Sequence, residues 1–429
     1  MKRFVISTLV TDANINEKFL ASLNNYCRKN KAELILIPNN LTKLTDEQMQ
    51  DKTILKVGRN LNRNLLVSVL PINPEQVDPI SGLDRLSSNK KSVIYASPKQ
   101  RLKSVASPSQ RLPRVLMTPG TVTHPNIKNT RRSIISNMDH LAGAIVVEIQ
   151  TKSVYHYRQV QAAKDGSFVD LGKRYHADKI TDVKLEALIP GDYHAGFTDP
   201  KVKSTIVNVL KKYTPKHLVL HDFFDGISVN HHIEHKILQR SIMGRLNDLS
   251  GELKFASNEL QELSELVKKV VVVKSNHDEF LDRWLNEGKY VSDERNHIIG
   301  LELALSKAQG SDPLEYGLKK YNKFRNVLFL KSDQSFKLTN KEIECGAHGH
   351  KGANGSRGSA GNLEKCYQNI VYGHSHSPEI LRGAWVVGTS TYLKLNYNEG
   401  PSSWMQTMCL IWEDGSRQLL NVIDGKCII

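Results

Sequence analysis

Two different hydrophobic periods mark the first forty residues of the chain. Residues 3–8, RFVIST, and residues 32–38, AELILIP, are short apolar runs typical of strands. Between them, apolar residues recur at helical spacing from Phe19 to Tyr26. The pattern predicts a strand, a helix and a strand, which is half of a Rossmann-like unit. No GxGxxG motif follows the first run, so we expect a scaffold here and no dinucleotide site.

A duplicated segment lies in the Pro- and Ser-punctuated region between residues 71 and 132. Residues 96–105, ASPKQRLKSV, are followed at once by residues 106–115, ASPSQRLPRV. One interpretation is two successive edge strands or turns of similar sequence. The other is a basic, proline-stiffened arm that contacts a nucleic-acid backbone. Its contact residues would be Lys99, Arg101, Lys103, Arg111 and Arg114.

The pattern changes again farther along the chain. Residues 143–160 predict a β-hairpin, and from about residue 185 short apolar strands alternate with helices, of which 231–248 and 251–270 are the clearest. Such alternation is typical of an α/β fold, whose ligands bind at the carboxyl ends of the strands. We therefore predict an N-terminal α/β domain, residues 1–150, that contains the duplicated segment, and a second α/β domain, residues 151–429.

Polar residues with metal-binding chemistry follow five of the predicted strands. A single histidine at a strand end is more often structural, but the repeated ending indicates a shared site. Carboxylate, amide and imidazole ligands suit Mn²⁺, Fe, Zn²⁺ or Mg²⁺, and a set of this size suits two ions. In chain order the residues are Asp192 and His194; Asp222 and Asp225; Asn276, His277 and Asp278; His348 and His350; and His374 and His376.

The last of these pairs lies in NIVYGHSHSPEI, residues 369–380. In an extended chain, residues two apart point to the same side, so both imidazoles would face one region of space. One metal ion could bind such a pair, and together with the other four strand ends the pair fits a shared metal site.

The order of these five motifs resembles that of the calcineurin-like metallophosphoesterases. GDYH, HDFFD, SNHD, AHGH and GHSH stand where that family has D-x-H, G-D-x-x-D, G-N-H-D/E, a lone His and G-H-x-H, over roughly residues 185–400. His221 and Ser275 replace glycines of the family pattern, which puts local loop geometry in question but removes no ligand. The resemblance implies a four-layer α/β/β/α sandwich, preceded here by the additional N-terminal α/β domain.

The resemblance also implies a role for each residue. Asp192, His194 and His376 would hold a first ion, Asn276, His348 and His374 a second, and Asp222 would bridge the two. His277 would contact the phosphoryl oxygens and protonate the leaving oxygen, with Asp278 orienting it. Asp225 would support the turn or a ligand histidine. His348 is preferred over His350 as the ligand, because it comes first after its strand. The expected cofactor is a pair of divalent ions, Mn²⁺ first, with Mg²⁺, Zn²⁺ or Fe as alternatives.

Charge favours an anionic partner. The chain carries 59 Lys and Arg against 44 Asp and Glu, a formal net charge of +15. Such an excess is typical of proteins that bind nucleic acid, and DNA is the expected partner. The five cysteines have no CxxC spacing, which argues against a disulfide framework or a zinc knuckle. No apolar run reaches the length of a membrane helix, so we expect no membrane contact.

Two further features have an open interpretation. Glycine recurs every third residue in GHKGANGSRGSAG, residues 349–361, which predicts either a mobile loop offering Lys351 and Arg357 to phosphates or a plain surface loop. His350 would then support a ligand or contact substrate. His231, His232 and His235 follow the second motif on a predicted helix and are assigned no role.

Three functional hypotheses follow. The first is a metal-dependent phosphodiesterase, a DNA nuclease similar to the nuclease subunits of double-strand-break repair complexes, that attacks with a metal-bridging hydroxide. The second is a phosphomonoesterase or phosphoprotein phosphatase on the same site. The third is a DNA-binding or host-interaction protein that uses the fold as a scaffold. We expect a bacteriophage origin and a cytoplasmic location in a bacterium or infected host. Homo-oligomerisation stays open.

Overall fold

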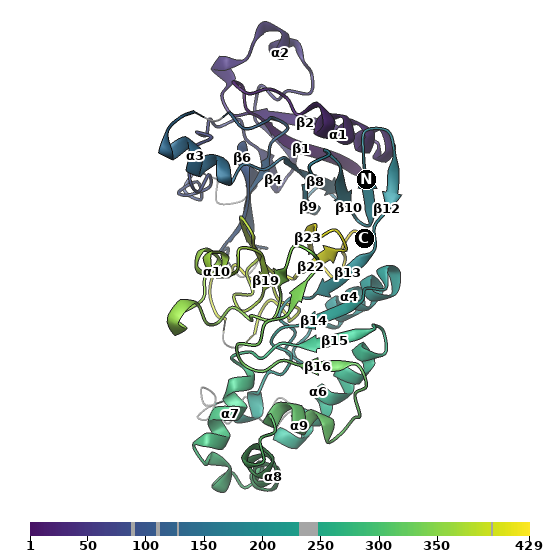
Figure 1. Ribbon diagram of the computed structural model, residues 1–429, viewed down its shortest axis with the longest axis vertical. Coiled ribbons are helices and arrows are strands. Elements are labelled where there is room, and N and C mark those ends of the chain that lie inside the picture. Colours follow the sequence, from purple (N-terminus) through teal and green to yellow (C-terminus); the bar gives the residue numbers. More distant parts are fainter. Residues whose placement is uncertain (87–90, 109–111, 127, 231–247, 396–397) are drawn as a thin grey trace.

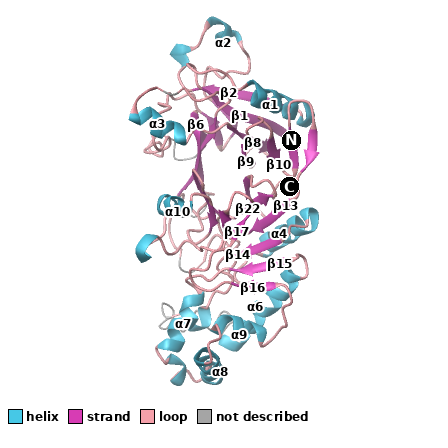
Figure 2. Ribbon diagram, viewed as in Figure 1, coloured by secondary structure: helices cyan, strands magenta, loops and turns pink. Residues whose placement is uncertain are grey.

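The computed structural model describes residues 1–86, 91–108, 112–126, 128–230, 248–395 and 398–429. These residues form a mixed α/β structure, as predicted, with strands gathered in four sheets. Figure 2 shows the strands running through the middle of the molecule, with most helices at its periphery. The predicted helix at 231–248, with His231, His232 and His235, and the predicted contact Arg111 lie outside the described residues.

The N-terminal sheet has the order β2-β1-β8-β9. Its strands are β1 (Lys2–Leu9), β2 (Ala32–Pro38), β8 (Gly143–Ile149) and β9 (Tyr155–Gln161). Helix α1 (Glu17–Asn30) begins after Asn16, whose side chain accepts a hydrogen bond from the Phe19 amide. Phe19, Leu23 and Tyr26 of α1 are buried against this sheet. The predicted strand–helix–strand unit is confirmed, and so is the predicted hairpin.

A six-stranded sheet has the order β16-β15-β14-β13-β22-β23, and its first four strands are parallel. The strands are β13 (Leu185–Ile189), β14 (His217–Leu220), β15 (Lys269–Val272), β16 (Val327–Phe329), β22 (Thr407–Trp412) and β23 (Arg417–Asn421). Its helices are α4 (Pro200–Tyr213), α6 (Leu249–Ser264), α7 (Asp278–Asn286), α8 (His297–Ala308) and α9 (Pro313–Lys319). The helix predicted over 251–270 ends earlier, at Ser264, and Val270 instead pairs in the following strand β15.

A ten-stranded sheet joins distant parts of the chain in the order β17-β18-β19-β21-β20-β6-β7-β5-β4-β3. From the C-terminal half come β17 (Lys337–Leu338), β18 (Ile343–Glu344), β19 (Ile370–Tyr372), β20 (Glu379–Leu381) and β21 (Ala384–Val386). From the N-terminal half come β3 (Arg59–Asn62), β4 (Leu65–Val67), β5 (Ser92–Ile94), β6 (Ser97–Val105) and β7 (Arg114–Gly120). The join is the antiparallel pairing of β20 with β6.

The remaining elements are small. Strands β10 (Phe168–Asp170), β11 (Lys173–Tyr175) and β12 (Ile180–Asp182) form a three-stranded sheet. Short helices α2 (Asp46–Gln50) and α3 (Arg131–Met138) lie in the N-terminal half, at the upper end of Figure 1. Helix α10 (Ala360–Tyr367) packs on β19 and β21.

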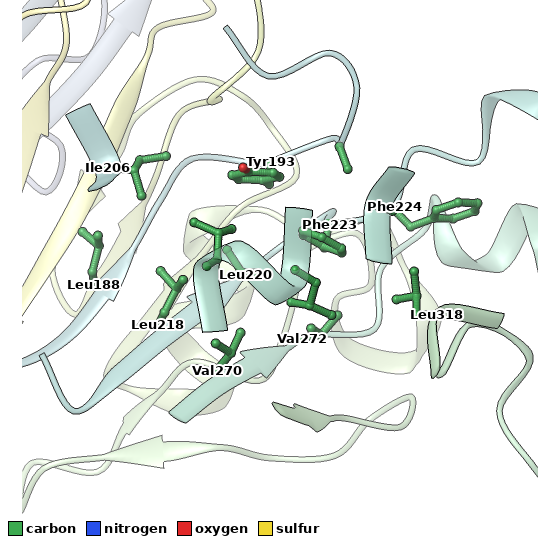
Figure 3. Close-up of a cluster of buried hydrophobic side chains, with 14 of the residues drawn as sticks. Leu188, Tyr193, Ile206, Leu218, Leu220, Phe223, Phe224, Val270, Val272 and Leu318 are labelled. Atoms are coloured by element: carbon green, nitrogen blue, oxygen red, sulfur yellow. The ribbon is translucent and has the colours of Figure 1, made fainter. Parts of the chain in front are cut away.

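Two hydrophobic clusters cover the two faces of the six-stranded sheet. One face packs against α4, α6, α7, α8 and α9, and Figure 3 shows part of this cluster around Leu218, Leu220, Val270 and Val272. The other face, with Ala187 and Val271, shares a second cluster with the ten-stranded and N-terminal sheets. The sheets are therefore joined by a continuous apolar interior.

The duplicated segment is not an arm. Its first copy is β6, an internal strand of the ten-stranded sheet, and only the end of its second copy enters β7. Lys99 and Arg101 are 4% and 6% exposed. The Lys99 ammonium donates to the Gln76 carbonyl oxygen, and Arg101 pairs with Asp78 and Glu379. The prediction that Lys99 and Arg101 contact phosphates was therefore wrong, because both side chains are buried and bind partners inside the fold.

Lys103 and Arg114 have a different environment. Lys103 is exposed and Arg114 is partly exposed. Lys103 lies opposite Glu379 and Arg114 opposite Val105 in the ladders of β6. Both therefore stay candidates for an anionic partner.

The predicted domain boundary at residue 150 stays a prediction. Strands from both sides of it share the ten-stranded sheet. One buried cluster includes Phe4 and Leu102 from before the boundary and Val219 and Trp385 from after it. The two parts consequently share one hydrophobic interior.

A buried ionic network ties the N-terminal sheet to the six-stranded sheet. Arg158 of β9 donates to Glu148 Oε2 at 2.6 Å and to Asp170 Oδ2 at 2.9 Å. Asp170 also accepts from the Tyr26 hydroxyl at 2.8 Å and from Gln418 of β23 at 2.9 Å. Burial raises the pKa of Asp170, but the charge and hydrogen bonds of Arg158 outweigh it, so the pKa is lowered. The carboxylate therefore stays charged and paired.

Loss of Arg158 is expected to destabilise the fold strongly. The Arg158→Met change leaves Glu148 and Asp170 as buried charges with fewer partners, which costs about 3–5 kcal/mol in the free energy of unfolding. The measurement is urea-induced unfolding. Lys173→Met, which breaks the exposed pair with Asp182, is the matched control and should cost less than about 1 kcal/mol. Equal destabilisation by both changes would contradict the role of the network.

Candidate metal centre

The predicted ligand residues meet at the carboxyl ends of strands from two sheets. Asp192 and His194 follow β13, Asp222 follows β14 and Asn276 follows β15, all in the six-stranded sheet. From the ten-stranded sheet, His348 follows β18, and His374 and His376 follow β19. Each sheet alone supplies only part of the set. The centre therefore lies where the two sheets face each other.

One half of the centre gathers Asp192, His194 and His376. The Nε2 atoms of His194 and His376 lie 3.2 Å apart, and His376 Nε2 lies 3.2 Å from Asp192 Oδ2. Asp222 Oδ2 lies 3.6 Å from His194 Nε2. This is the grouping that the sequence predicted for a first ion.

The other half gathers Asn276, His348 and His374. Asn276 Oδ1 lies 3.0 Å from His348 Nε2 and 3.1 Å from His374 Nδ1. Asp222 Oδ2 lies 3.1 Å from His348 Nε2, so the same carboxylate oxygen faces both halves. His374 and His376 consequently serve different halves, as predicted.

The charge of the centre fits a cation. Asp192 and Asp222 are buried, and Oδ1 of each has no hydrogen-bond partner among the described residues. Burial raises the pKa of Asp222, but the charges of His348 and His277 outweigh it and hold the pKa low. Asp192 and Asp222 each have a carboxylate oxygen within 4.8 Å of the other. Two buried carboxylates at that distance repel each other unless a positive charge lies between them. The described residues include two His/Asp sets with metal-binding spacing, Asp192–Asp222–His348 and His194–Asp222–His277.

The surroundings of His348 and His374 shift their pKa values in opposite directions. Burial lowers the pKa of His348, but the Asp222 carboxylate reverses this and raises it to about 9. Burial and the nearby charge of His348 lower the pKa of His374 to about 4. His374 therefore stays neutral, with a lone pair available. A metal ion would take the place of the proton on His348, since a ligating imidazole must be neutral.

Apolar anchors fix the loops that carry the aspartates. Tyr193 and Phe223 are fully buried, and their rings stack with centroids 5.4 Å apart (Figure 3). The amide of His194 donates to the Asp222 carbonyl oxygen at 2.7 Å. The ladder between β13 and β14 thus continues past the strand ends and holds Asp192 beside Asp222.

The backbone of the centre is strained. His194, Asp222, His374 and His376 have φ values of 48°, 43°, 71° and 56°, in the left-handed region that costs a residue with a Cβ atom of order 1 kcal/mol or more. His374 and His376 therefore do not continue β19 as an extended chain, and that part of the sequence argument was wrong. The preceding Gly373 is required, because a Cβ atom there would lie 1.9 Å from Asp192 Oδ1.

Asp225 supports a ligand histidine, as expected for it, whereas Asp278 does not orient His277. Asp225 Oδ1 accepts from His194 Nδ1 at 2.8 Å, which leaves His194 Nε2 facing the centre. The carbonyl oxygen of Asp225 accepts from His277 Nδ1 at 2.7 Å. Asp278 Oδ2 instead accepts from the Ser275 amide at 2.9 Å, at the start of α7. Asp278 as the group that orients His277 was therefore wrong, because its carboxylate is used in the turn.

The glycine-rich loop forms a defined turn beside the centre. Lys351 and Arg357 face each other across a short β-bridge, and both are exposed. Lys351 pairs with Glu279, whose Oε1 atom also lies 3.4 Å from His350 Nε2. His350 Nε2 thus faces α7, while the His350 ring lies 5.4 Å from the His348 ring and 6.0 Å from the His374 ring.

Two residues near the centre were missed. Glu279 fixes the glycine-rich loop, and its position directly after SNHD was the only signal. Trp404 packs edge-on against His376 with ring centroids 4.2 Å apart, and nothing in the sequence around it pointed to that place. His221, which replaces a glycine of the family pattern, is fully buried and stacks on His348.

The chain is similar to a phage protein. It is 27% identical over 464 residues to "Protein A1" of Escherichia phage T5, and the similarity covers 99% of this chain and 82% of that protein. No family model and no solved structure matches the chain. Among the described helices, none is long and apolar enough to cross a membrane.

Proposed function

We propose that this chain is a dinuclear metal-dependent phosphodiesterase that hydrolyses nucleic acid, with DNA as substrate. The observation that carries the proposal is that the other six predicted ligand residues form two groups around Asp222, whose Oδ2 atom faces both groups. The arrangement of sheets and helices supports a four-layer α/β/β/α sandwich in the sense of the metallophosphoesterases.

The ligand roles follow from the two halves of the centre. Asp192, His194 and His376 would hold one divalent ion, and Asn276, His348 and His374 the other, with Asp222 between them. Such a pair of ions polarises phosphoryl oxygens and lowers the pKa of water. Nitrogen and oxygen donors without thiolate suit Mn²⁺, and also Mg²⁺, Zn²⁺ or Fe.

His277 is the proposed proton donor. Its Nδ1 atom donates to the Asp225 carbonyl oxygen, which fixes the ring and leaves Nε2 for the substrate. The side chain is 15% exposed, so an entering phosphate has access to it. Nε2 would hydrogen-bond a phosphoryl oxygen and give a proton to the leaving oxygen.

The net charge of +15 supports a diester polymer over a small monoester. A phosphomonoesterase or phosphoprotein phosphatase would use the same centre, and a DNA-binding scaffold would use none of its chemistry. Buried carboxylate oxygens of Asp192 and Asp222 have no hydrogen-bond partner among the described residues, which argues against the scaffold, because a protein without bound cations gains nothing from them.

Replacement of Asp222 is expected to abolish hydrolysis. Asp222→Asn removes the charge shared by both halves, so turnover of bis(p-nitrophenyl) phosphate with Mn²⁺ should fall about a hundredfold or more. Bound metal is measured by mass spectrometry after gel filtration, and folding by circular dichroism. Asp182→Asn, at an exposed carboxylate, is the control. A folded Asp222→Asn protein with wild-type turnover would overturn the proposed centre.

Replacement of Asp225 tests how His194 is held. Asp225→Asn replaces an anionic acceptor with a neutral one at His194 Nδ1, so Mn²⁺ affinity should fall about 10-fold to 100-fold. Asp278→Asn changes the turn before α7 and should leave Mn²⁺ affinity closer to wild type. Calorimetric titration of the metal-free proteins with Mn²⁺ measures both. A larger loss with Asp278→Asn would contradict the assignment of Asp225.

The substrate class is tested by a metal screen. The metal-free protein should gain activity on linear, circular or single-stranded DNA, and on bis(p-nitrophenyl) phosphate, when Mn²⁺ is added and lose it with a chelator. Preference for p-nitrophenyl phosphate would favour the phosphomonoesterase. Tight DNA binding without turnover under Mn²⁺, Mg²⁺, Zn²⁺ or Fe²⁺ would favour the scaffold.

A further inference from the structure

A groove of about 510 Å³ is lined by residues of both halves of the chain. Its walls come from the β3–β4 turn, the start of β5, the second copy of the duplicated segment, the β8–β9 hairpin and the segments around Met405 and Asn421. None of the five strand-end motifs contributes to it.

Positive charge dominates the lining. Arg63, Lys91 and Arg114 line the groove, against the carboxylate of Asp424. Arg63 is exposed, while Lys91 and Arg114 are partly buried. In the described part of the chain, neither Arg63 nor Lys91 forms an ion pair, and the Lys91 ammonium donates only to Asn60 Oδ1, at 2.7 Å. Arg63 and Lys91 therefore bring positive charge to the groove that no ion pair in the described part of the chain neutralises, unlike the charge of Arg101.

A buried phenol supplies a second, independent signal. Tyr157 lines the groove, is 2% exposed, and its hydroxyl has no hydrogen-bond partner among the described residues. Burial raises the pKa of this phenol, so it stays a donor at neutral pH. Buried donors are normally paired, and an unpaired one in the lining of this groove fits the oxygen of an anion.

A backbone hydrogen bond connects the wall of the groove to the loop of His376. The amide of Met405, which lines the groove, donates to the carbonyl oxygen of His376 at 3.1 Å. Trp404, one residue earlier, packs on the His376 ring. Ser107 and Ser402 exchange two backbone hydrogen bonds of 2.9 Å, which fix the second copy of the duplicated segment to this strip.

We propose that this groove binds the sugar–phosphate backbone of the nucleic-acid strand whose scissile phosphate lies at the metal centre. Arg63, Lys91 and Arg114 contact phosphates, and the Tyr157 hydroxyl donates to one of their oxygens. The inference rests on the proposed nuclease function and adds a reason for it: a polymer fills the centre and the groove together, whereas a small phosphomonoester fills only the centre.

The test measures binding apart from cleavage. In the full-length Asp222→Asn protein, the combined change Arg63→Gln, Lys91→Gln and Arg114→Gln should lower affinity for a fluorescent single-stranded oligonucleotide about tenfold or more. The slope of log affinity against log salt should fall by about 2, because each lost phosphate contact removes about 0.7. The control Lys211→Gln, Lys254→Gln and Lys268→Gln removes the same charge from exposed positions on the side of α4 and α6. It should retain both affinity and slope.

Tyr157→Phe tests the phenol without a risk to folding, because the hydroxyl that it removes has no partner in the described structure. Affinity should fall about threefold to tenfold with unchanged thermal stability. Unchanged affinity would overturn the contact assigned to Tyr157. Equal affinities of the groove variant and the lysine control would overturn the groove as a whole.

Failure of the proposed function has a different signature. If the wild-type protein hydrolyses neither DNA nor bis(p-nitrophenyl) phosphate with any divalent ion, the function fails whatever the groove variants bind. If it hydrolyses the small diester and the groove variant loses none of its affinity for the oligonucleotide, only the groove inference fails.

Discussion

The metal centre depends on the packing of two sheets against each other. Asp192, His194, Asp222 and Asn276 belong to the six-stranded sheet, while His348, His374 and His376 belong to the ten-stranded sheet. Each half of the centre combines ligands from both sheets. Distances of 3.0–3.2 Å across this junction need the sheets to keep their separation to a fraction of an ångström. The shared apolar cluster between them provides that constraint, because close-packed interiors resist small displacements.

The same packing makes a costly arrangement of charge tolerable. Asp192 and Asp222 are fully buried, and four residues of the centre have left-handed backbone conformations. Such a cluster is unfavourable by itself, and the surrounding fold must over-determine it. The Tyr193–Phe223 stack and the ladder continued beyond β13 and β14 do so on one side. On the other side, Gly373 lets the His374 loop approach the Asp192 carboxylate, because a Cβ atom at this position would clash with that carboxylate.

Sequence reasoning found the candidate ligands that the structure brings together, because their positions depend on local order along the chain. Each ligand follows an apolar strand within a few residues, and parallel strands end at one edge. The same reasoning assigned the orientation of His277 to Asp278 instead of Asp225, because these hydrogen bonds are set by the turn geometry after β14 and β15. It also took Lys99 and Arg101 for surface cations. A basic segment is normally expected at the surface. Arg101 is buried because it forms ion pairs with Asp78 and Glu379, and neither residue is close to Arg101 in the sequence.

The pairing of β6 with β20 explains why the N-terminal half of the chain contributes to the candidate metal centre. Without β6, strand β20 would be an open edge directly after the loop of His374 and His376, and open edges are flexible and prone to pairing with other chains. β6 closes that edge, and the residues that follow it reach the strip of Ser402 and Met405 beside His376. The N-terminal half therefore both completes the sheet that carries half of the ligands and supplies Arg63, Lys91 and Arg114 to the adjoining groove.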